Sequence, residues 1–140
     1  MRKTTLAMLL LCSVALLGGC KTASVNTPPA PGYNNATDQQ IGEIINSGTV
    51  FYRTIQCETQ GKNYNVQTQA CVADASITAP LALSPTEKAS FNGFGIALNA
   101  AKTVYAEYHA GTATLAQAQA AATNVTTQQT ALQSSIPGVK

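Results

Sequence analysis

The chain has 140 residues, which leaves room for one domain with a modest core. Its formal net charge of +2 comes from Arg2 and Lys3, because the residues after Cys20 carry as many acidic as basic side chains. This balance gives no electrostatic reason to expect nucleic acid or anionic lipid headgroups as partners. Beyond Cys20, large aliphatic residues are few and alanine is plentiful, which favours thin helices that need a covalent link or a partner for support.

The first nineteen residues have the parts of a secretory signal. A basic pair at residues 2–3 precedes an apolar run over 6–17, and two small residues at 18–19 lead to Cys20. A run of this length is short for crossing about 30 Å of hydrocarbon, so a retained transmembrane helix is the weaker interpretation. We therefore expect residues 1–19 to be a signal peptide.

The end of this segment, Leu17-Gly18-Gly19-Cys20, resembles the lipobox of bacterial lipoproteins at every position. The resemblance implies a diacylglyceryl group on Cys20, cleavage before Cys20 and, in many bacteria, a further acyl chain on the new amine. Each buried methylene contributes about 0.8 kcal/mol, so two or three chains would hold the protein stably in membrane lipid. An ordinary cleaved signal with Cys20 incidental is the alternative.

The residue after Cys20 indicates whether the protein would be anchored in the inner or the outer membrane. Lys21 stands where lipoproteins kept in the inner membrane of enterobacteria typically carry Asp, which favours the outer membrane facing the periplasm. At the other end of the chain, Lys140 is similar to the terminal lysine that murein lipoprotein joins to peptidoglycan. That protein ends in Tyr-Arg-Lys, whereas this chain ends in Pro-Gly-Val-Lys at residues 137–140. A terminal lysine that occurs by chance is therefore the preferred interpretation.

Residues 20–36 are predicted to be the lipidated N-terminus and an extended tether. The stretch contains Pro28, Pro29, Pro31 and Gly32 and has almost no apolar periodicity. Prolines make such a segment semi-rigid, so it would hold the domain away from the membrane. The remaining residues, 37–140, are predicted to form the domain.

A first helix is predicted from about Asp38 to Cys57, with Thr37 or Asp38 as its N-cap. Its apolar residues recur at the three-and-four spacing of a single helical face. This face consists of Ile41, Ile44, Ile45, Gly48, Phe51, Tyr52 and Ile55. Glycine costs about 1 kcal/mol relative to alanine inside a helix, so Gly42 and Gly48 indicate tertiary support or close packing.

Two cysteines remain for the domain once Cys12 leaves with the signal and Cys20 carries lipid. Disulfides persist outside the cytoplasm, so we predict a bond between Cys57 and Cys71. A metal site is the weaker alternative, because two separated cysteines and one distant histidine lack the usual ligand spacing.

The stretch between the two cysteines is predicted to be a polar surface loop, residues 58–70. Asn63, Tyr64 and Asn65 are its candidate binding residues, because amides form hydrogen bonds and an aromatic ring can stack on a ligand. An ordinary disulfide-closed connection is the preferred alternative. Residues 72–83 are expected to run in extended form over the helices.

Two further helices carry clear start signals. Ser84-Pro85-Thr86-Glu87 forms a capping box with proline at the first helical position and predicts a helix over about 85–110, with Gly111 as its stop. Thr114 and Gln117 form another capping box, which predicts a helix over about 115–135. The short connection between the two helices forces an antiparallel hairpin.

The inner faces of these helices are predicted from their spacing. The first face comprises Phe91, Phe94, Leu98, Ala101, Tyr105 and Tyr108, and the second comprises Leu115, Ala118, Ala122, Val125, Gln129, Leu132 and Ile136. Aromatic residues at this spacing are far more often core than a ligand-binding stripe. The glycines of Asn92-Gly93-Phe94-Gly95 lack a preceding strand, so they predict close helix packing rather than a phosphate loop.

Catalytic chemistry has little support in the sequence. The single histidine, His109, is predicted at a helix end, where it can interact favourably with the helix dipole. No two acidic residues stand three or four apart to share a helical face. We therefore predict no catalytic residue, no metal ligand and no cofactor.

The sequence thus predicts an all-α fold, a small three-helix domain with an antiparallel C-terminal helical hairpin and one disulfide-closed loop. From the lipobox resemblance we expect a membrane-anchored lipoprotein of the cell envelope with a non-enzymatic structural or interaction role. The alternative is a module that binds a cell-wall glycan such as peptidoglycan, or an envelope protein, through the 58–70 loop.

Overall fold

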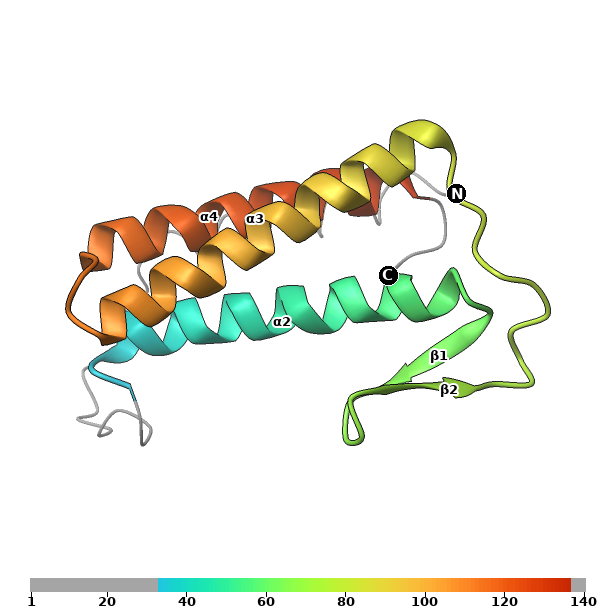
Figure 1. Ribbon diagram of the computed structural model, residues 1–140, viewed down its shortest axis with the longest axis horizontal. Coiled ribbons are helices and arrows are strands. Elements are labelled where there is room, and N and C mark those ends of the chain that lie inside the picture. The colour runs from blue at the N-terminus through green and yellow to red at the C-terminus, as the bar shows by residue number, and fades with distance from the viewer. Residues whose placement is uncertain (1–32, 137–140) are drawn as a thin grey trace, which may run out of the picture.

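The computed structural model describes residues 33–136. In this part of the chain three long helices lie alongside one another, and a short two-stranded antiparallel sheet extends from one end of the first (Figure 1). The elements in chain order are α2 (Ala36–Glu58), β1 (Lys62–Asn65), β2 (Ala70–Ala73), α3 (Pro85–His109) and α4 (Leu115–Ser135). The predicted signal peptide, Cys20 and Lys140 lie outside the described residues.

Helix α2 begins slightly earlier than predicted, and its N-cap is neither Thr37 nor Asp38. The cap is Asn35, whose side-chain oxygen accepts a hydrogen bond from the backbone N–H of Asp38 at 2.9 Å. The carboxylate of Asp38 in turn accepts a bond from the backbone N–H of Asn34 at 2.7 Å. The aspartate thus satisfies one backbone donor, the N–H of Asn34, from within the first turn, where a negative charge also suits the helix dipole.

The predicted starts of α3 and α4 are confirmed. The hydroxyl of Ser84 accepts from the N–H of Glu87 at 3.3 Å, and the carboxylate of Glu87 accepts from the N–H of Ser84 at 2.6 Å. Thr114 and Gln117 make the same reciprocal pair. Gly111 follows α3 with a φ of 77°, a left-handed conformation that glycine adopts without steric cost. The chain reverses there, so α3 and α4 form an antiparallel hairpin (Figure 1).

The core lies between the three helices and consists of the predicted faces. Its buried members are Ile41, Ile45, Phe51, Ile55, Phe94, Leu98, Ala101, Ala118, Ala122, Val125, Leu132 and Ile136. The rings of Phe51 and Phe94 meet edge to face with centroids 5.7 Å apart. Burying one such side chain fully stabilises the fold by about 1.5–3 kcal/mol. The predicted aromatic stripe of α3 is therefore mainly a packing surface.

Close packing at the glycines of α2 is also confirmed. A Cβ atom placed on Gly48 would lie 2.9 Å from Cγ1 of Val125 and 3.3 Å from Cδ1 of Leu98. At Gly42 it would lie 2.7 Å from the ring of Tyr33 and 2.9 Å from the hydroxyl of Tyr105. The missing side chains thus let α2 approach α3 and α4 directly.

The described chain is mainly helical, as predicted, but the stretch between the cysteines is not an irregular loop: it contributes to a small antiparallel sheet that the all-α prediction did not include. Strands β1 and β2 pair antiparallel, with Tyr64 opposite Cys71. Each strand has only four residues, too few for an alternation of apolar and polar residues to stand out in the sequence. At the turn, the side-chain oxygen of Asn65 accepts from the N–H of Thr68 at 2.9 Å, and Gln69 has a positive φ of 53°.

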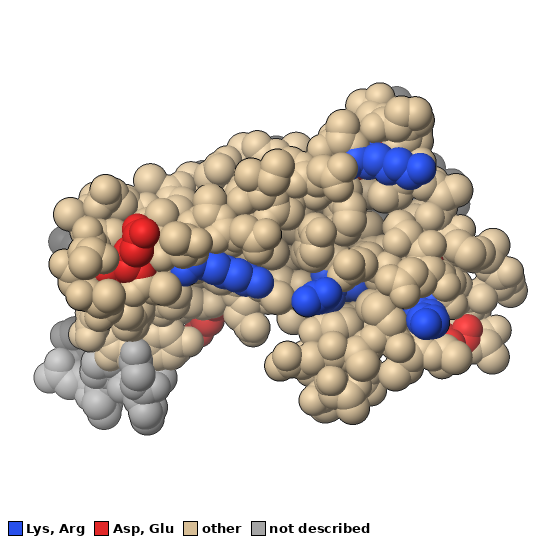
Figure 2. Space-filling model, viewed as in Figure 1, with Lys and Arg blue, Asp and Glu red and all other residues tan. Residues whose placement is uncertain are grey.

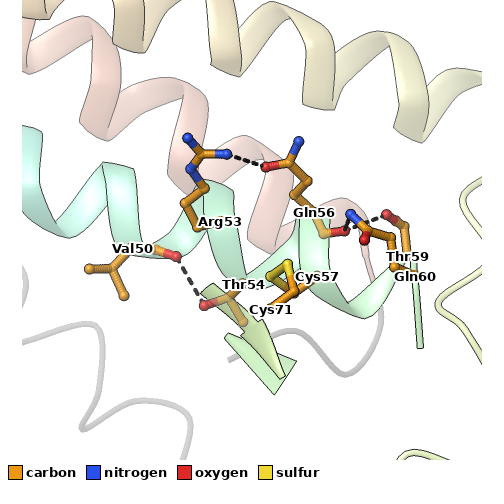
Figure 3. The surroundings of a disulfide bond; sticks show 8 residues. All are labelled: Val50, Arg53, Thr54, Gln56, Cys57, Thr59, Gln60 and Cys71. Atoms are coloured by element: carbon orange, nitrogen blue, oxygen red, sulfur yellow. Dashed lines mark hydrogen bonds between the residues drawn. A yellow bond between two sulfur atoms is a disulfide. The ribbon is translucent and has the colours of Figure 1, made fainter. Parts of the chain in front are cut away.

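The predicted disulfide between Cys57 and Cys71 is present, with the two Cα atoms 5.3 Å apart. It joins the last turn of α2 to β2 and so holds the hairpin against the helix (Figure 3). Of residues 72–83, which were expected to be extended, 72–73 belong to β2 and a turn follows in which the N–H of Ile77 donates to the carbonyl of Asp74 at 3.1 Å. Residues 78–83 contain no helix or strand, and Leu81 and Leu83 pack against the core.

Candidate functional site

The three candidate binding residues of the predicted loop, Asn63, Tyr64 and Asn65, lie on β1. Tyr64 shares its face of the hairpin with Cys71, which is bonded to α2, and it is half-buried. The side-chain amide of Asn63 donates to the carboxylate of Asp74 at 3.2 Å, and Asn65 closes the turn. The side chains of Asn63 and Asn65 therefore bond to the hairpin itself and to Asp74 directly after it.

A different pair of side chains comes together at the other end of the molecule. Nε2 of His109, the last residue of α3, lies 3.0 Å from Oδ1 of Asp38 in the first turn of α2. The side chain of Asp38 is fully buried at 0% exposure, whereas that of His109 is 32% exposed. His109 does lie at a helix end as predicted, but the sequence did not reveal its buried partner 71 residues away.

The surroundings of Asp38 keep it ionised. Desolvation by burial raises the pKa of its carboxyl group, but hydrogen bonds from the backbone of Asn34 and from His109, with the charge of His109, hold the pKa below its ordinary value. The hydroxyl of Tyr105 also donates to the backbone carbonyl of Asp38 at 3.3 Å. Burial, and then the adjacent carboxylate, raise the pKa of Tyr105, so this phenol stays neutral.

This arrangement joins two helix ends. The rings of Tyr105 and Tyr108 both lie edge-on to the imidazole of His109, with centroids 4.6 and 5.4 Å away. An aspartate and the histidine that it orients are two members of a hydrolytic triad. The third member is a nucleophile hydrogen-bonded to the second ring nitrogen of the histidine. Among residues 33–136, the bond to Asp38 is the only side-chain hydrogen bond of His109, and no group of three metal-ligating side chains occurs.

A groove of about 240 Å³ lies between α2 and α3. Each helix contributes four residues at the spacing i, i+3, i+4, i+7, which places them on one helical face. From α2 the groove is lined by Thr49, Tyr52, Arg53 and Gln56. From α3 it is lined by Gly95, Leu98, Asn99 and Lys102. Two cations and no carboxylate are among these eight residues, and Figure 2 shows Lys and Arg side chains along the region of this face where α2 and α3 meet.

The wall and floor of the groove follow from packing. A Cβ atom on Gly95 would lie 2.8 Å from the ring of Tyr52, so the glycine lets this ring lie against the backbone of α3. The Tyr52 ring also stacks on Phe91, with centroids 4.5 Å apart, and lies 6.2 Å from the ring of Phe94. Leu98 in the floor is 2% exposed and belongs to the core.

The polar groups of the groove are partly oriented by one another. Nη1 of Arg53 donates to Oε1 of Gln56 at 2.7 Å, which leaves the amide nitrogen of Gln56 as a donor (Figure 3). Desolvation by burial lowers the pKa of Lys102, and the positive charge of Arg53 lowers it further.

The sequence alone did not reveal this groove. It assigned Tyr52 and Leu98 to apolar faces, and Arg53 and Lys102 stand directly beside those faces. The sequence did contain a signal for it: an amide and a cation three residues apart beside the apolar face of each helix. These are Gln56 and Arg53 on α2, and Asn99 and Lys102 on α3. Only the packing of α2 on α3 brings the two edges together.

No protein-family model matches this chain, and searches of curated proteins and of solved structures found no match either. Within residues 33–136, none of the helices combines the length and the apolar character needed to span a bilayer. Any functional assignment therefore rests on the lipobox motif and on the geometry described above.

Proposed function

We propose that the protein is a membrane-anchored lipoprotein of the cell envelope, whose helical domain has a structural or interaction role rather than a catalytic one. The observation that carries the proposal is the motif Leu17-Gly18-Gly19-Cys20 after a basic start and an apolar run. Lipid on Cys20 is then the anchor, and Lys21 favours the outer membrane, with the domain facing the periplasm.

Two features of the domain support this location and role. The Cys57–Cys71 disulfide suits a compartment outside the cytoplasm, where such bonds persist. The bond from Asn34 to the buried carboxylate of Asp38, which His109 also contacts, ties the beginning of the domain to α2 and α3. A domain held to a membrane by its N-terminus benefits from such a tie.

Lipidation is tested by comparing the wild-type protein with Cys20→Ser and, as a matched control, Cys12→Ser in cells. We expect labelled palmitate in the wild-type and Cys12→Ser proteins, and an N-terminal peptide of the mature chain whose mass includes acylated Cys20. Cys20→Ser should carry no label, because the thioether needs the thiol. An unmodified N-terminus in the wild-type protein, or label retained by Cys20→Ser, contradicts the proposal.

A second candidate function is binding of an envelope protein through the predicted 58–70 loop together with the rest of the β1–β2 hairpin, which ends at Ala73. It is favoured by Val66 and Val72, whose exposed fractions of 52% and 39% are high for large apolar side chains. Binding of a cell-wall glycan by the same segment has less support, because Asn63 and Asn65 already make the bonds described above.

The hairpin candidate is tested with a photoreactive amino acid at Val66 and, for comparison, at Thr127, an exposed position of α4. A specific protein adduct formed in cells from position 66 but not from position 127 supports it. The same adducts from both positions, or none from position 66, exclude the hairpin as the interface.

A further inference from the structure

The two cations of the groove have no acidic partner among the residues that the structure describes. A charged residue on a helix usually pairs with residues three or four positions away. Around Arg53 the residues at these positions are Thr49, Val50, Gln56 and Cys57. Around Lys102 they are Leu98, Asn99, Tyr105 and Ala106. Within residues 33–136, neither cation lies within ion-pairing distance of a carboxylate. The groove thus places two positive charges side by side, although acidic and basic side chains beyond Cys20 are equal in number.

This concentration has a cost that an anion would relieve. Two like charges at one site repel each other, and partial burial removes some of the water that stabilises the ammonium group. Both effects lower the pKa of Lys102. A bound anion offsets both, because it attracts each cation and replaces lost hydration.

The neutral side chains of the groove are suited to a ligand that also carries hydroxyl groups. The amide nitrogen of Gln56 is held in place through Oε1, and Asn99 provides both a donor and an acceptor. The hydroxyl of Thr49 donates to the carbonyl of Ile45 at 2.7 Å, so its oxygen remains an acceptor. A volume of about 240 Å³ is below that of drug-sized sites and fits a group the size of one sugar ring.

We infer that the groove between α2 and α3 binds a small acidic sugar, with its anionic group between the guanidinium of Arg53 and the ammonium of Lys102. Gln56 and Asn99 contact the hydroxyl or acetamido groups of the ring. A carboxylate and a phosphate satisfy the two cations through the same chemistry. This site goes beyond the proposed anchoring role and does not depend on lipid at Cys20 or on the hairpin.

The test uses the full mature chain and two matched pairs of sugars. Binding of each sugar is measured by the NMR shifts of the side-chain N–H groups of Arg53, Gln56 and Asn99. N-acetylmuramic acid is compared with N-acetylglucosamine, and glucose 6-phosphate with glucose, because each pair differs by the acidic substituent. We expect saturable shifts with at least one acidic sugar and much smaller ones with its neutral counterpart. Response to only one acid identifies carboxylate or phosphate as the natural group.

Two substitutions assign the effect to the groove. Arg53→Gln and Lys102→Gln should each weaken binding of the acidic sugar about tenfold, since each removes one charge-assisted contact. Lys88→Gln, which removes an exposed cation outside the groove, should change affinity by less than about twofold because the contact is local. Circular dichroism verifies that each variant remains folded.

Three results would overturn the inference. One is the absence of saturable shifts with both acidic sugars. Another is equal binding of the neutral sugars, which would mean that the cations contribute nothing. The third is an equal loss with Lys88→Gln, which would indicate diffuse attraction to the surface. None of these results bears on the lipidation of Cys20, so the anchoring proposal stands or falls separately.

Discussion

At the scale of single residues, Asp38 is the side chain on which the N-terminal end of the bundle depends. Its pKa in the folded protein lies below the ordinary value of 3.8, so the ionised form favours folding. This contribution is fully present above about pH 3.8 and is lost as the pH falls through the lower folded-state value. The partners of the carboxylate that set this behaviour are His109 on α3 and the backbone N–H of Asn34.

We therefore expect Asp38→Asn to lower the free energy of unfolding at pH 7 by about 1–3 kcal/mol, because an amide cannot accept every bond that the buried carboxylate accepts. The variant should also lose the part of the acid sensitivity that Asp38 causes. Urea unfolding at a series of pH values measures both effects. Glu107→Gln, at an exposed position of α3, should follow the wild-type curve. If the free energies of unfolding of the wild type and of Asp38→Asn change with pH in parallel, this assignment is contradicted.

Two glycines on facing helices should respond oppositely to alanine. At Gly93 a Cβ atom has nothing within 4 Å, so Gly93→Ala should stabilise the protein by about 0.5–1 kcal/mol through helix propensity. At Gly48 the Cβ would lie 2.9 Å from Val125, so Gly48→Ala should destabilise it by about 1–3 kcal/mol through overpacking. Urea midpoints measured side by side test the pair. Equal shifts, or the reverse order, would show that the packing at Gly48 is looser than described.

At the scale of elements, the hairpin of β1 and β2 depends on its link to α2. The two strands have only four residues each, and a lone two-stranded hairpin is marginally stable in water. The disulfide between Cys57 and Cys71 limits the freedom of the unfolded chain and keeps the hairpin on the helix. The hairpin therefore owes its position to a covalent bond more than to buried apolar surface.

The double variant Cys57→Ser/Cys71→Ser should lose about 3 kcal/mol of stability according to the chain-entropy model. Thermal unfolding measures this loss, and far-UV circular dichroism should still show folded helices at low temperature, because the core lies between α2, α3 and α4. A reducing agent should lower the melting temperature of the wild type and leave the variant unchanged. Sensitivity of the variant to the reductant would mean that another thiol is responsible.

The elements also show which local features can be predicted. Ser84 with Glu87, and Thr114 with Gln117, were identified because a capping box depends only on residues three positions apart. The first cap was misplaced because Asn35, Thr37 and Asp38 can all accept backbone bonds, and the choice among them depends on where the chain enters. The strands were missed because each has only four residues, and neither KNYN nor ACVA alternates between polar and apolar residues.

At the scale of the whole molecule, the balanced charge bears on how the protein is held to a membrane. Acidic and basic side chains beyond Cys20 are equal in number, so attraction to anionic headgroups contributes little. We expect detergent, but not concentrated salt, to release the wild-type protein from membranes, because salt screens charges and leaves buried acyl chains in place. Fractionation followed by immunoblotting tests this. Release of the wild type by salt alone would indicate a peripheral protein held by charge.

The sequence by itself determined the predicted lipid anchor motif, the helix starts at Ser84 and Thr114, the three apolar faces and the pairing of Cys57 with Cys71. These features depend on neighbouring residues or on elimination among a few cysteines, so they can be recognised along the chain. Tertiary structure alone decided the contact of Asp38 with His109, the β pairing and the groove that joins Arg53 to Lys102. Each of these features brings together groups from separate elements. The distance between such groups is set by how the elements pack on one another and not by any spacing in the sequence.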